Sequence, residues 1–293
     1  MMDGKVCLVT GASRGIGRAT VEGLARLGAT ILMSCRHREA GEAARREIIA
    51  ATGNARITLL VADLSSQAEV RRLVQEVKAA TPRLDVLINN AGTFQMHREE
   101  TVDRVEATFA TNHLAPFLLT TGLLDLLEAS APARVIMVAS EAHQRATDPE
   151  DWESTKRYNG ITAYGRSKLA NVMFCYDLAH RLEGSGVTIN ACHPGVVGTE
   201  LLESGYRRWW SHWLWPFVKR FTISPEDAAT SLLYLAASRD VEGVSGKYFK
   251  RSRPATSSLL SHDAVVGARL WNVSLRLTGQ LPAVEITGEH IAH

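Results

Sequence analysis

The fold is decided by one stretch of sequence, Thr10-Gly11-Ala12-Ser13-Arg14-Gly15-Ile16-Gly17, which separates a short apolar run from an amphipathic stretch. The run before it, Val6 to Thr10, has the length and composition of a buried strand. After it, apolar side chains recur every three or four residues from Ile16 to Leu27, as on one face of a helix. Glycines between a strand and a helix allow a sharp turn and a close approach to a pyrophosphate, which free N–H groups at the helix start would bind.

The alternation of short apolar runs and helical stretches continues for about 200 residues beyond this turn. The runs are rich in Val, Ile and Leu, which is typical of strands buried on both faces of a parallel sheet. They are Ile31–Ser34, Ile57–Val61, Val86–Ile88, Val135–Val138, Val187–Ala191 and Gly246–Phe249. We therefore predict an α/β fold, a single domain over residues 1–293 with a Rossmann-type doubly wound parallel sheet of about seven strands and helices on both faces.

Composition excludes several classes of function. Hydrophobic residues make up 45% of the 293 residues and charged residues 22%, as in an ordinary soluble globular protein. The net charge of +2 gives no electrostatic reason to expect nucleic acid as a partner. Four cysteines, at 7, 35, 175 and 192, are not spaced as metal ligands or as a redox pair, so we predict reduced thiols and no metal site. The sequence shows no signal peptide and no run of about 18 apolar residues, which predicts a cytoplasmic protein.

The second apolar run leads into Ser34-Cys35-Arg36-His37-Arg38, where a protein that prefers NAD usually has an acidic residue for the ribose hydroxyls. This stretch contains no acidic residue. Arg36, together with Arg14 of the glycine turn, would pair with a 2′-phosphate through charge and fork geometry. The predicted cofactor is therefore NADP(H) rather than NAD(H), and the alternative is a pair of solvated surface arginines.

Tyr164 and Lys168 lie four residues apart at the start of a strongly patterned helix, so both side chains share one helix face. A tyrosine normally titrates near ~10, but a neighbouring ammonium and the positive charge of an oxidised nicotinamide would lower its pKa. Tyr164 would then protonate a forming alkoxide, or deprotonate an alcohol in the reverse direction. Ser140, after the run Val135–Val138, would orient the substrate oxygen, and the amide of Asn112 would hold a water that relays protons to Lys168.

Taken in order, these pieces resemble the short-chain dehydrogenase/reductase superfamily over about residues 4–250. The matching pieces are the glycine turn at 10–17, Asp63-Leu64, Asn89-Asn90-Ala91-Gly92, Asn112, Ser140, Tyr164 with Lys168, and Pro194-Gly195.

The resemblance implies a role for each matching piece. Asn112, Ser140, Tyr164 and Lys168 would form a catalytic tetrad, with Lys168 also binding the nicotinamide ribose. Cofactor contacts would come from Gly11, Ser13, Arg14, Gly15, Ile16, Gly17, Arg36, Asp63, Asn90, Ala91, Gly92, Tyr164, Lys168, Pro194, Gly195, Val197 and Thr199. Two of these have simpler alternatives: Asp63 as a helix N-cap before Ser65-Ser66, and Pro194-Gly195 as a plain turn. Asn89 is expected to brace the sheet, and the nearby His113 and His143 are assigned no catalytic role.

Within the superfamily the chain is similar to the retinol dehydrogenase branch. The stretches that carry this similarity are 112–114, 140–143, 164–171, 193–197, 245–249 and 270–274, together with the long gap between Ser140 and Tyr164. The similarity implies a lipophilic substrate, such as retinal, retinol or another long apolar aldehyde or ketone. Many animal members have an N-terminal hydrophobic anchor, which we do not find in this sequence. The alternatives are a reductase of small xenobiotic carbonyls and an NADP(H)-binding redox sensor or scaffold with little turnover.

Four of the six tryptophans lie in Tyr206–Phe221, within a segment at about 200–222 that we expect to form a lid over the substrate. Mixed aromatic and basic residues also suit a peripheral membrane contact, and plain packing is the third alternative. The tail at about 251–293 is expected to be helical, covering the cleft or contributing to an interface. The resemblance also implies a homodimer, paired through the helix of Tyr164 and the one before it.

Overall fold

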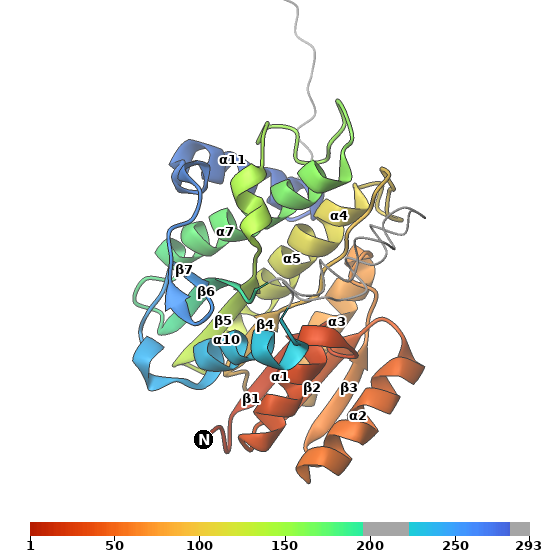
Figure 1. Ribbon diagram of the computed structural model, residues 1–293, viewed down its shortest axis with the longest axis vertical. Helices are drawn as coiled ribbons and strands as arrows, with labels where there is room; N and C mark the ends of the chain where they lie inside the picture. The colour runs from red at the N-terminus through yellow and green to blue at the C-terminus, as the bar shows by residue number, and fades with distance from the viewer. Residues whose placement is uncertain (196–222, 282–293) are drawn as a thin grey trace, which may run out of the picture.

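The computed structural model describes residues 1–195 and 223–281, and its centre is an eight-stranded sheet in the order β3-β2-β1-β4-β5-β6-β7-β8 (Figure 1). Neighbouring strands run parallel except β7 and β8, which are antiparallel. The strands are β1 (Val6–Thr10), β2 (Thr30–Cys35), β3 (Ile57–Val61), β4 (Val86–Asn89), β5 (Ala133–Val138), β6 (Val187–His193), β7 (Lys247–Lys250) and β8 (Arg253–Pro254). The predicted doubly wound α/β fold is confirmed, with eight strands instead of about seven because the two-residue β8 adds a short hairpin edge.

Helices cover both faces of this sheet. Buried side chains of α1 (Gly15–Arg26), α2 (Arg38–Thr52) and α10 (Pro225–Ala237) fill one face, and those of α3 (Gln67–Ala80), α5 (Ala115–Gly122) and α7 (Gly160–Arg181) fill the other. Shorter helices complete the second face and its loops: α4 (Ala107–Phe109), the π-helix η1 (Ala110–Leu114), α6 (Leu124–Ala129) and the 3₁₀ helices η2 (Glu141–Arg145) and η5 (Leu259–His262). The 3₁₀ helix η4 (Arg239–Val241) adds Val241 to the core of the first face.

The C-terminal tail contributes to the core as far as it is described. Its helix α11 (Ala264–Leu277) packs on α7, and the Trp271 ring lies edge-on to Phe117 and stacks against Phe174. The Arg181 guanidinium lies 3.8 Å from the centre of the same indole ring. The tail is therefore a third layer over α5 and α7, which are the two helices that the resemblance suggested for pairing.

The chain order creates a switch point in the sheet. The chain moves outward from β1 to β2 and β3, and then returns to place β4 on the other side of β1. In such sheets a crevice opens at the carboxyl ends of the strands where the direction reverses, and ligands bind there. The loops after β1 and β4 therefore border the expected cofactor site.

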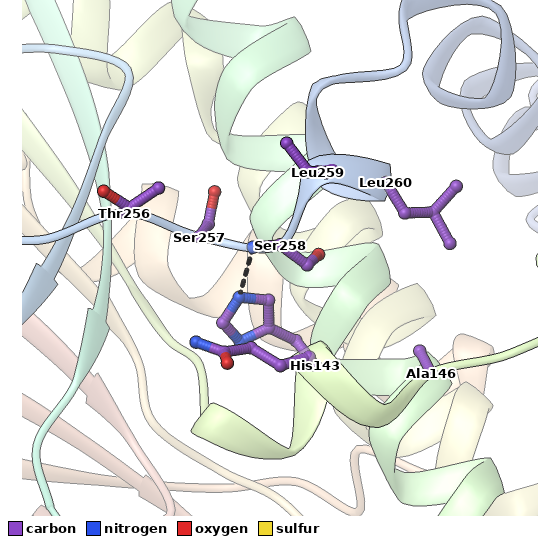
Figure 2. Close-up of a pocket in the computed structure, with 8 residues that line it drawn as sticks. His143, Ala146, Thr256, Ser257, Ser258, Leu259 and Leu260 are labelled. Carbon is purple, nitrogen blue, oxygen red and sulfur yellow. Dashed lines mark hydrogen bonds between the residues drawn. The ribbon is translucent and has the colours of Figure 1, made fainter.

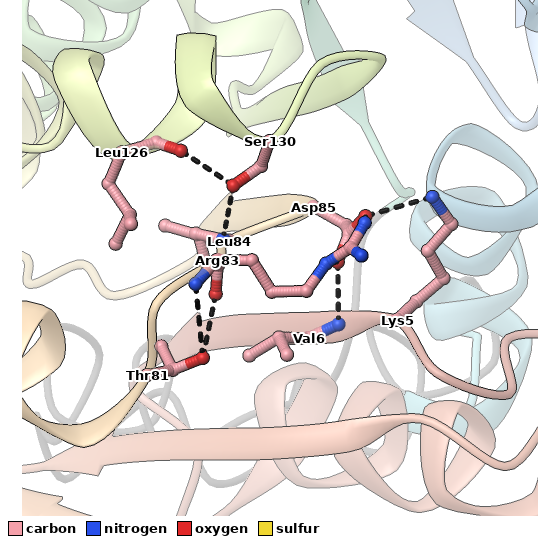
Figure 3. Close-up of polar contacts among 8 residues, drawn as sticks. All are labelled: Lys5, Val6, Thr81, Arg83, Leu84, Asp85, Leu126 and Ser130. Atoms are coloured by element: carbon pink, nitrogen blue, oxygen red, sulfur yellow. Dashed lines mark hydrogen bonds and ion pairs between the residues drawn. The ribbon is translucent and has the colours of Figure 1, made fainter.

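At the amino ends of the strands, away from this crevice, Asp85 connects the start of β1 to the start of β4 (Figure 3). Its carboxylate accepts hydrogen bonds from Lys5 Nζ at 2.8 Å, from the Val6 N–H at 2.9 Å and from Arg83 Nε at 2.9 Å. Burial raises the pKa of Asp85, but the hydrogen bonds from Arg83, Lys5 and Val6 outweigh this and hold the pKa below its ordinary value. The cluster joins two elements that are 79 residues apart in the chain, at the end of the sheet away from the site.

Several predictions fall on residues 196–222 and 282–293, which lie outside the described residues. They concern Val197, Thr199, the lid at about 200–222 with Tyr206–Phe221, and the end of the tail. Among the described residues, no helix combines the length and apolar character needed to span a bilayer. All four cysteines are buried and unpaired with one another.

Candidate active site

The glycine turn is held against the loop after β4. Gly11 has φ +64°, and a Cβ on it would lie 2.9 Å from the Ala91 Cα, so both conformation and contact require glycine. A Cβ on Gly17 would collide with the Gly11 carbonyl oxygen. Asn90 Nδ2 donates to the Thr10 carbonyl at 2.8 Å, and the Thr10 hydroxyl accepts from the N–H groups of Asn90 and Ala91 at 3.0 Å each. Two predicted cofactor-binding stretches are therefore brought together at the switch point.

The turn leads into a helix start that is suited to an anion. Gly15 is the first residue of α1, and the N-cap residue Arg14 makes no side-chain capping hydrogen bond. The first N–H groups of α1 thus lack a side-chain acceptor from their N-cap, which is the usual arrangement where a phosphate binds. Ser13 and Ile16 are half-buried in the turn, and the Arg14 side chain is exposed.

Arg36 follows directly after β2 and is exposed at the carboxyl ends of the strands, where the glycine turn also lies after β1. Its Nε donates to Nε2 of the neighbouring His37 at 3.0 Å. The structure therefore places a guanidinium, and no carboxylate, at the end of the second strand.

Asp63 lies beyond the end of β3, where its carboxylate accepts from the N–H and the hydroxyl of Ser65 at 2.9 and 2.8 Å. The N-cap of α3 is Ser66, which accepts from the Glu69 N–H. The alternative of Asp63 as the N-cap is therefore wrong, and Asp63 instead shapes the loop before α3.

Tyr164 lies in the first turn and a half of α7. Asn159 caps this helix by accepting from the N–H groups of Ile161 and Thr162, at 3.0 and 3.2 Å. The ring of Phe94 lies edge-on to the Tyr164 ring, with centroids 5.7 Å apart. Burial raises the pKa of Tyr164 to about 12, and the neighbouring Ser140 side chain opposes this by hydrogen bonding to the phenol.

Lys168 lies one helical turn further along α7 and is buried. Its Nζ donates to the Val138 carbonyl at 3.0 Å and lies 5.5 Å from the centre of the Tyr164 ring. Burial lowers the pKa of Lys168 to about 8. The pair thus shares one helix face as predicted, but without a cofactor burial outweighs any lowering of the Tyr164 pKa by Lys168.

Asn112 lies in the π-helix η1, which interrupts the α-helical path between α4 and α5. Its Oδ1 accepts from the Thr93 N–H at 2.7 Å, and its Nδ2 donates to the Thr93 carbonyl at 2.9 Å and to Ser167 Oγ at 3.0 Å. The amide thus ties the loop after β4 to α7. A Cβ on Gly92 would lie 3.3 Å from Asn112 Oδ1 and 3.6 Å from Lys168 Nζ, so this loop passes close to two of the predicted catalytic residues.

Ser140 begins the turn after β5. Its Oγ accepts from the Ala142 N–H at 3.2 Å, and the same side chain lowers the pKa of the Tyr164 phenol, against the effect of burial. Its carbonyl accepts from the His143 N–H at 3.1 Å, which closes the turn. Ser140 and Tyr164 can therefore address the same substrate oxygen.

Pro194 and Gly195 follow β6 at the same carboxyl edge of the sheet. Gly195 has φ +113°, and a Cβ on it would lie 2.5 Å from Cδ1 of Ile223, so the backbone and its surroundings both require glycine. Asn89, at the end of β4, donates to Thr120 Oγ1 at 2.9 Å and to Met137 Sδ at 3.2 Å, and so braces the sheet as expected.

The structure adds residues that sequence reasoning missed. The sequence predicts Thr10 only as the end of the first strand and the start of the turn, whereas in the structure it connects the turn to the loop after β4. Thr93 and Ser167 hold the Asn112 amide, and Phe94 packs on Tyr164. Only proximity to the motifs could have indicated them, because single Thr, Ser and Phe residues occur in many loops.

These features fit a nicotinamide dinucleotide: an uncapped helix start for the pyrophosphate, a close glycine loop, and a Tyr–Lys pair beside a serine hydroxyl. Among the described residues, no cluster of three or more His, Cys, Asp or Glu side chains is arranged to hold a metal.

Comparison with known proteins supports this interpretation. Residues 5–208 match the family model described as short chain dehydrogenase. Mouse retinol dehydrogenase 14 is 41% identical, over 96% of this chain and 88% of its own. Human retinol dehydrogenase 13 is also 41% identical, over 96% and 87%.

Solved structures agree on the fold. An uncharacterised protein from Mycobacterium paratuberculosis is 31% identical with a TM-score of 0.77, covering 95% of this chain and 94% of its own. RhlG of Pseudomonas aeruginosa, solved in complex with NADP, is 29% identical with a TM-score of 0.70, covering 85% and 95%. The chain belongs to the short-chain dehydrogenase family and is similar to its retinol dehydrogenases.

Proposed function

We propose that this protein is an NADP(H)-dependent oxidoreductase that moves a hydride between the nicotinamide and the carbonyl or alcohol carbon of a lipophilic substrate. The observation that carries the proposal is the convergence of Ser140, Tyr164 and Lys168 at the carboxyl edge of the sheet, beside the glycine turn. Asn112 braces the same site from η1.

The protonation states favour carbonyl reduction. With a pKa of about 12, Tyr164 is a neutral phenol near pH 7 and can donate its proton to an alkoxide as it forms. The Ser140 hydroxyl can donate a hydrogen bond to the same oxygen and fix its position. When bound, the reduced nicotinamide supplies the hydride. Alcohol oxidation requires the phenolate, which is scarce at neutral pH unless the positive charge of a bound oxidised nicotinamide lowers the pKa of Tyr164.

The preference for NADP(H) is supported by the guanidinium of Arg36 directly after β2, on the same edge as the exposed Arg14. A short-chain dehydrogenase from Burkholderia cenocepacia that is 26% identical to this chain, with a TM-score of 0.69, was also solved with NADP.

A lipophilic substrate is supported by the names of the relatives and by apolar side chains near Tyr164. Phe94 contacts its ring. Two exposed apolar residues, Met96 and Ile161, lie on adjoining segments, because Gly160 packs directly against the Met96 backbone. We retain the segment at about 200–222 as the proposed lid, with a peripheral membrane contact through Tyr206–Phe221 or plain packing as the alternatives. Flotation with liposomes tests the membrane contact, since a lid or a packed segment alone gives no lipid association.

The proposal is tested by following oxidation of NADPH and, separately, NADH with aldehydes from short aliphatic chains to all-trans-retinal. We expect kcat/KM to rise with chain length and to favour NADPH by at least ~10-fold, since removal of one charge-assisted contact commonly costs about 1.5–3 kcal/mol. Preference for short polar carbonyls would contradict the substrate class. NADPH binding without any turnover would instead favour a redox sensor.

A further inference from the structure

His143 lies three residues after Ser140, at the boundary between the turn and the C-terminal segment 256–260. Its side chain is almost fully buried, at 1% exposure. Figure 2 shows its ring below Ser258, with the backbone of the C-terminal segment crossing above it. Both segments line a pocket of about 500 Å³, formed by His143, Gln144, Ala146 and residues 256–260.

Both ring nitrogens of His143 have partners that fix its tautomer. Nδ1 lies 2.6 Å from the Ser140 carbonyl oxygen, which can only accept, so Nδ1 carries the proton. Nε2 lies 3.1 Å from the Ser258 backbone nitrogen, whose N–H can only donate, so Nε2 is the acceptor. The imidazole must therefore be neutral to make both bonds, because a protonated ring has no acceptor for Ser258.

The turn held by this ring is packed tightly against the catalytic helix. Gly165, the residue after Tyr164, lies so close to η2 that a Cβ on it would be 2.9 Å from the Ala142 carbonyl oxygen. A displacement of η2 would therefore change the separation of Ser140 and Tyr164, which must address one substrate oxygen.

The C-terminal segment has its own anchor on α7. The Ser257 hydroxyl hydrogen bonds to the Tyr176 hydroxyl at 2.7 Å, to Ser261 Oγ at 2.7 Å and to His262 Nε2 at 3.0 Å. Ser258 is thus presented to His143 by a fixed backbone, and the ring joins two parts of the chain that are 115 residues apart.

We propose that His143 is a positioning residue for hydride transfer: as a neutral imidazole it fastens the Ser140 turn to the C-terminal segment 256–260, and its protonation or loss releases both. This inference rests on the proposed function, because it acts through the role of Ser140.

Several charged and titratable groups lie near His143 and affect its pKa or titrate in the same range. Burial lowers its pKa, opposed by the Ser140 carbonyl and by the Glu141 carboxylate. Glu141 forms an ion pair with Lys250 and lies 3.5 Å from Nε2 of His193. The Tyr248 ring packs on His143 with centroids 5.0 Å apart. Since Glu141 and His193 can also titrate in acid, the effect of His143 must be isolated by substitution.

The test compares the full-length protein with His143→Gln, His143→Phe and the matched control His180→Gln, which makes the same change at an exposed histidine. Glutamine can donate and accept at every pH, whereas phenylalanine can do neither. For His143→Phe we expect kcat to fall ~10-fold, with KM for NADPH within about twofold, and amide exchange of residues 256–260 to accelerate ~10-fold. For the wild type and His180→Gln we expect kcat to fall as the pH drops below the ordinary histidine pKa of ~6.5, and for His143→Gln we expect this fall to be absent.

The proposal is overturned if His143→Phe keeps wild-type kcat and exchange, or if His143→Gln loses activity in acid as the wild type does. If His143→Phe does not fold, as judged by circular dichroism, the pH profile of His143→Gln decides. A wild type without turnover would contradict the proposed function instead, and the exchange of residues 256–260 would still test the bond between His143 and Ser258.

Discussion

At the scale of single residues, burial shifts the pKa values of Tyr164 and Lys168 in opposite directions. The spacing of these two residues correctly predicted a shared helix face, and the ammonium was expected to lower the tyrosine pKa. In the structure burial raises the pKa of Tyr164 and lowers that of Lys168, so each is driven toward its neutral form. Desolvation depends on every atom packed around the site, and therefore it could not be predicted from sequence spacing.

The lowered pKa of Lys168 predicts an alkaline limit to activity. Its ammonium is present below a pKa of about 8 and is lost as the pH rises through that value. If Lys168 binds the ribose as predicted, we expect kcat/KM for NADPH in carbonyl reduction to fall above about pH 8, approaching ~10-fold per pH unit, because the charge-assisted hydrogen bond of the ammonium is lost. Lys168→Arg should be slower but show no such fall, since arginine stays charged. A flat wild-type profile up to about pH 10 would refute this assignment.

Arg36 should determine cofactor preference. Arg36→Asp replaces the partner of a 2′-phosphate with a carboxylate that repels it and suits ribose hydroxyls. We expect kcat/KM for NADPH to fall ~100-fold and that for NADH to rise, measured by steady-state kinetics with one aldehyde. The control is Arg46→Asp, the same charge change at an exposed position of α2, which should leave the ratio within about twofold. An unchanged ratio in Arg36→Asp would mean that Arg36 is a solvated surface arginine.

At the scale of elements, the hydrophobic pattern predicted seven of the eight strands. The run 246–249 was expected to form an edge strand, but β8 lies outside it, because two residues such as Arg253–Pro254 are too short to show a period. The π-helix that holds Asn112 also could not be predicted, since its sequence Ala110–Leu114 is compatible with an ordinary helix. The order of the motifs predicted the catalytic residues, whereas the bracing of Asn112 by Thr93 and Ser167 depends on tertiary contacts.

Asp85 predicts a large effect on stability that is separate from activity. Asp85→Ala removes the acceptor for Lys5, Arg83 and the buried Val6 N–H, so we expect the free energy of unfolding to drop by about 3 kcal/mol. Asp125→Ala is the matched control, because the Asp125 ion pair with Lys78 is exposed and should contribute less than about 1 kcal/mol. Urea unfolding followed by circular dichroism measures both. Equal losses in the two variants would contradict the structural role of Asp85, and KM should be unchanged in each.

At the scale of the whole molecule, the C-terminal tail is integrated into the helical layer over α5 and α7. The sequence predicted a helix but could not decide its packing, because a helix with one apolar face fits a cleft or an interface equally well. Contacts of Trp271 with Phe117 and Phe174 show that α11 covers the chain's own helices. A homodimer remains a prediction, and pairing directly through this face would have to accommodate α11.

His113 connects three parts of this layer and should make the fold sensitive to acid. Its ring hydrogen bonds to Asn171 of α7 at 3.3 Å and to Ser274 of α11 at 2.9 Å, and burial lowers its pKa to about 4. The folded state therefore resists protonation, and stability present above about pH 6.5 is lost as the pH falls toward 4, by up to about 3 kcal/mol. His113→Gln should lower the melting temperature at pH 7 and weaken its fall between pH 6.5 and about 4.5. An acid fall as steep as that of the wild type would assign the sensitivity to other groups, such as His193, whose pKa is also about 4.

The central claim is that Tyr164 supplies the proton for hydride transfer from NADPH. The most direct measurement is NADPH oxidation by Tyr164→Phe with a long-chain aldehyde, combined with NADPH binding measured by quenching of protein fluorescence. We predict that kcat falls at least ~10³-fold while the Kd for NADPH stays within about threefold, because the phenol hydroxyl acts on the reacting oxygen. Turnover near the wild-type rate in Tyr164→Phe would show that another group supplies the proton and would contradict the account.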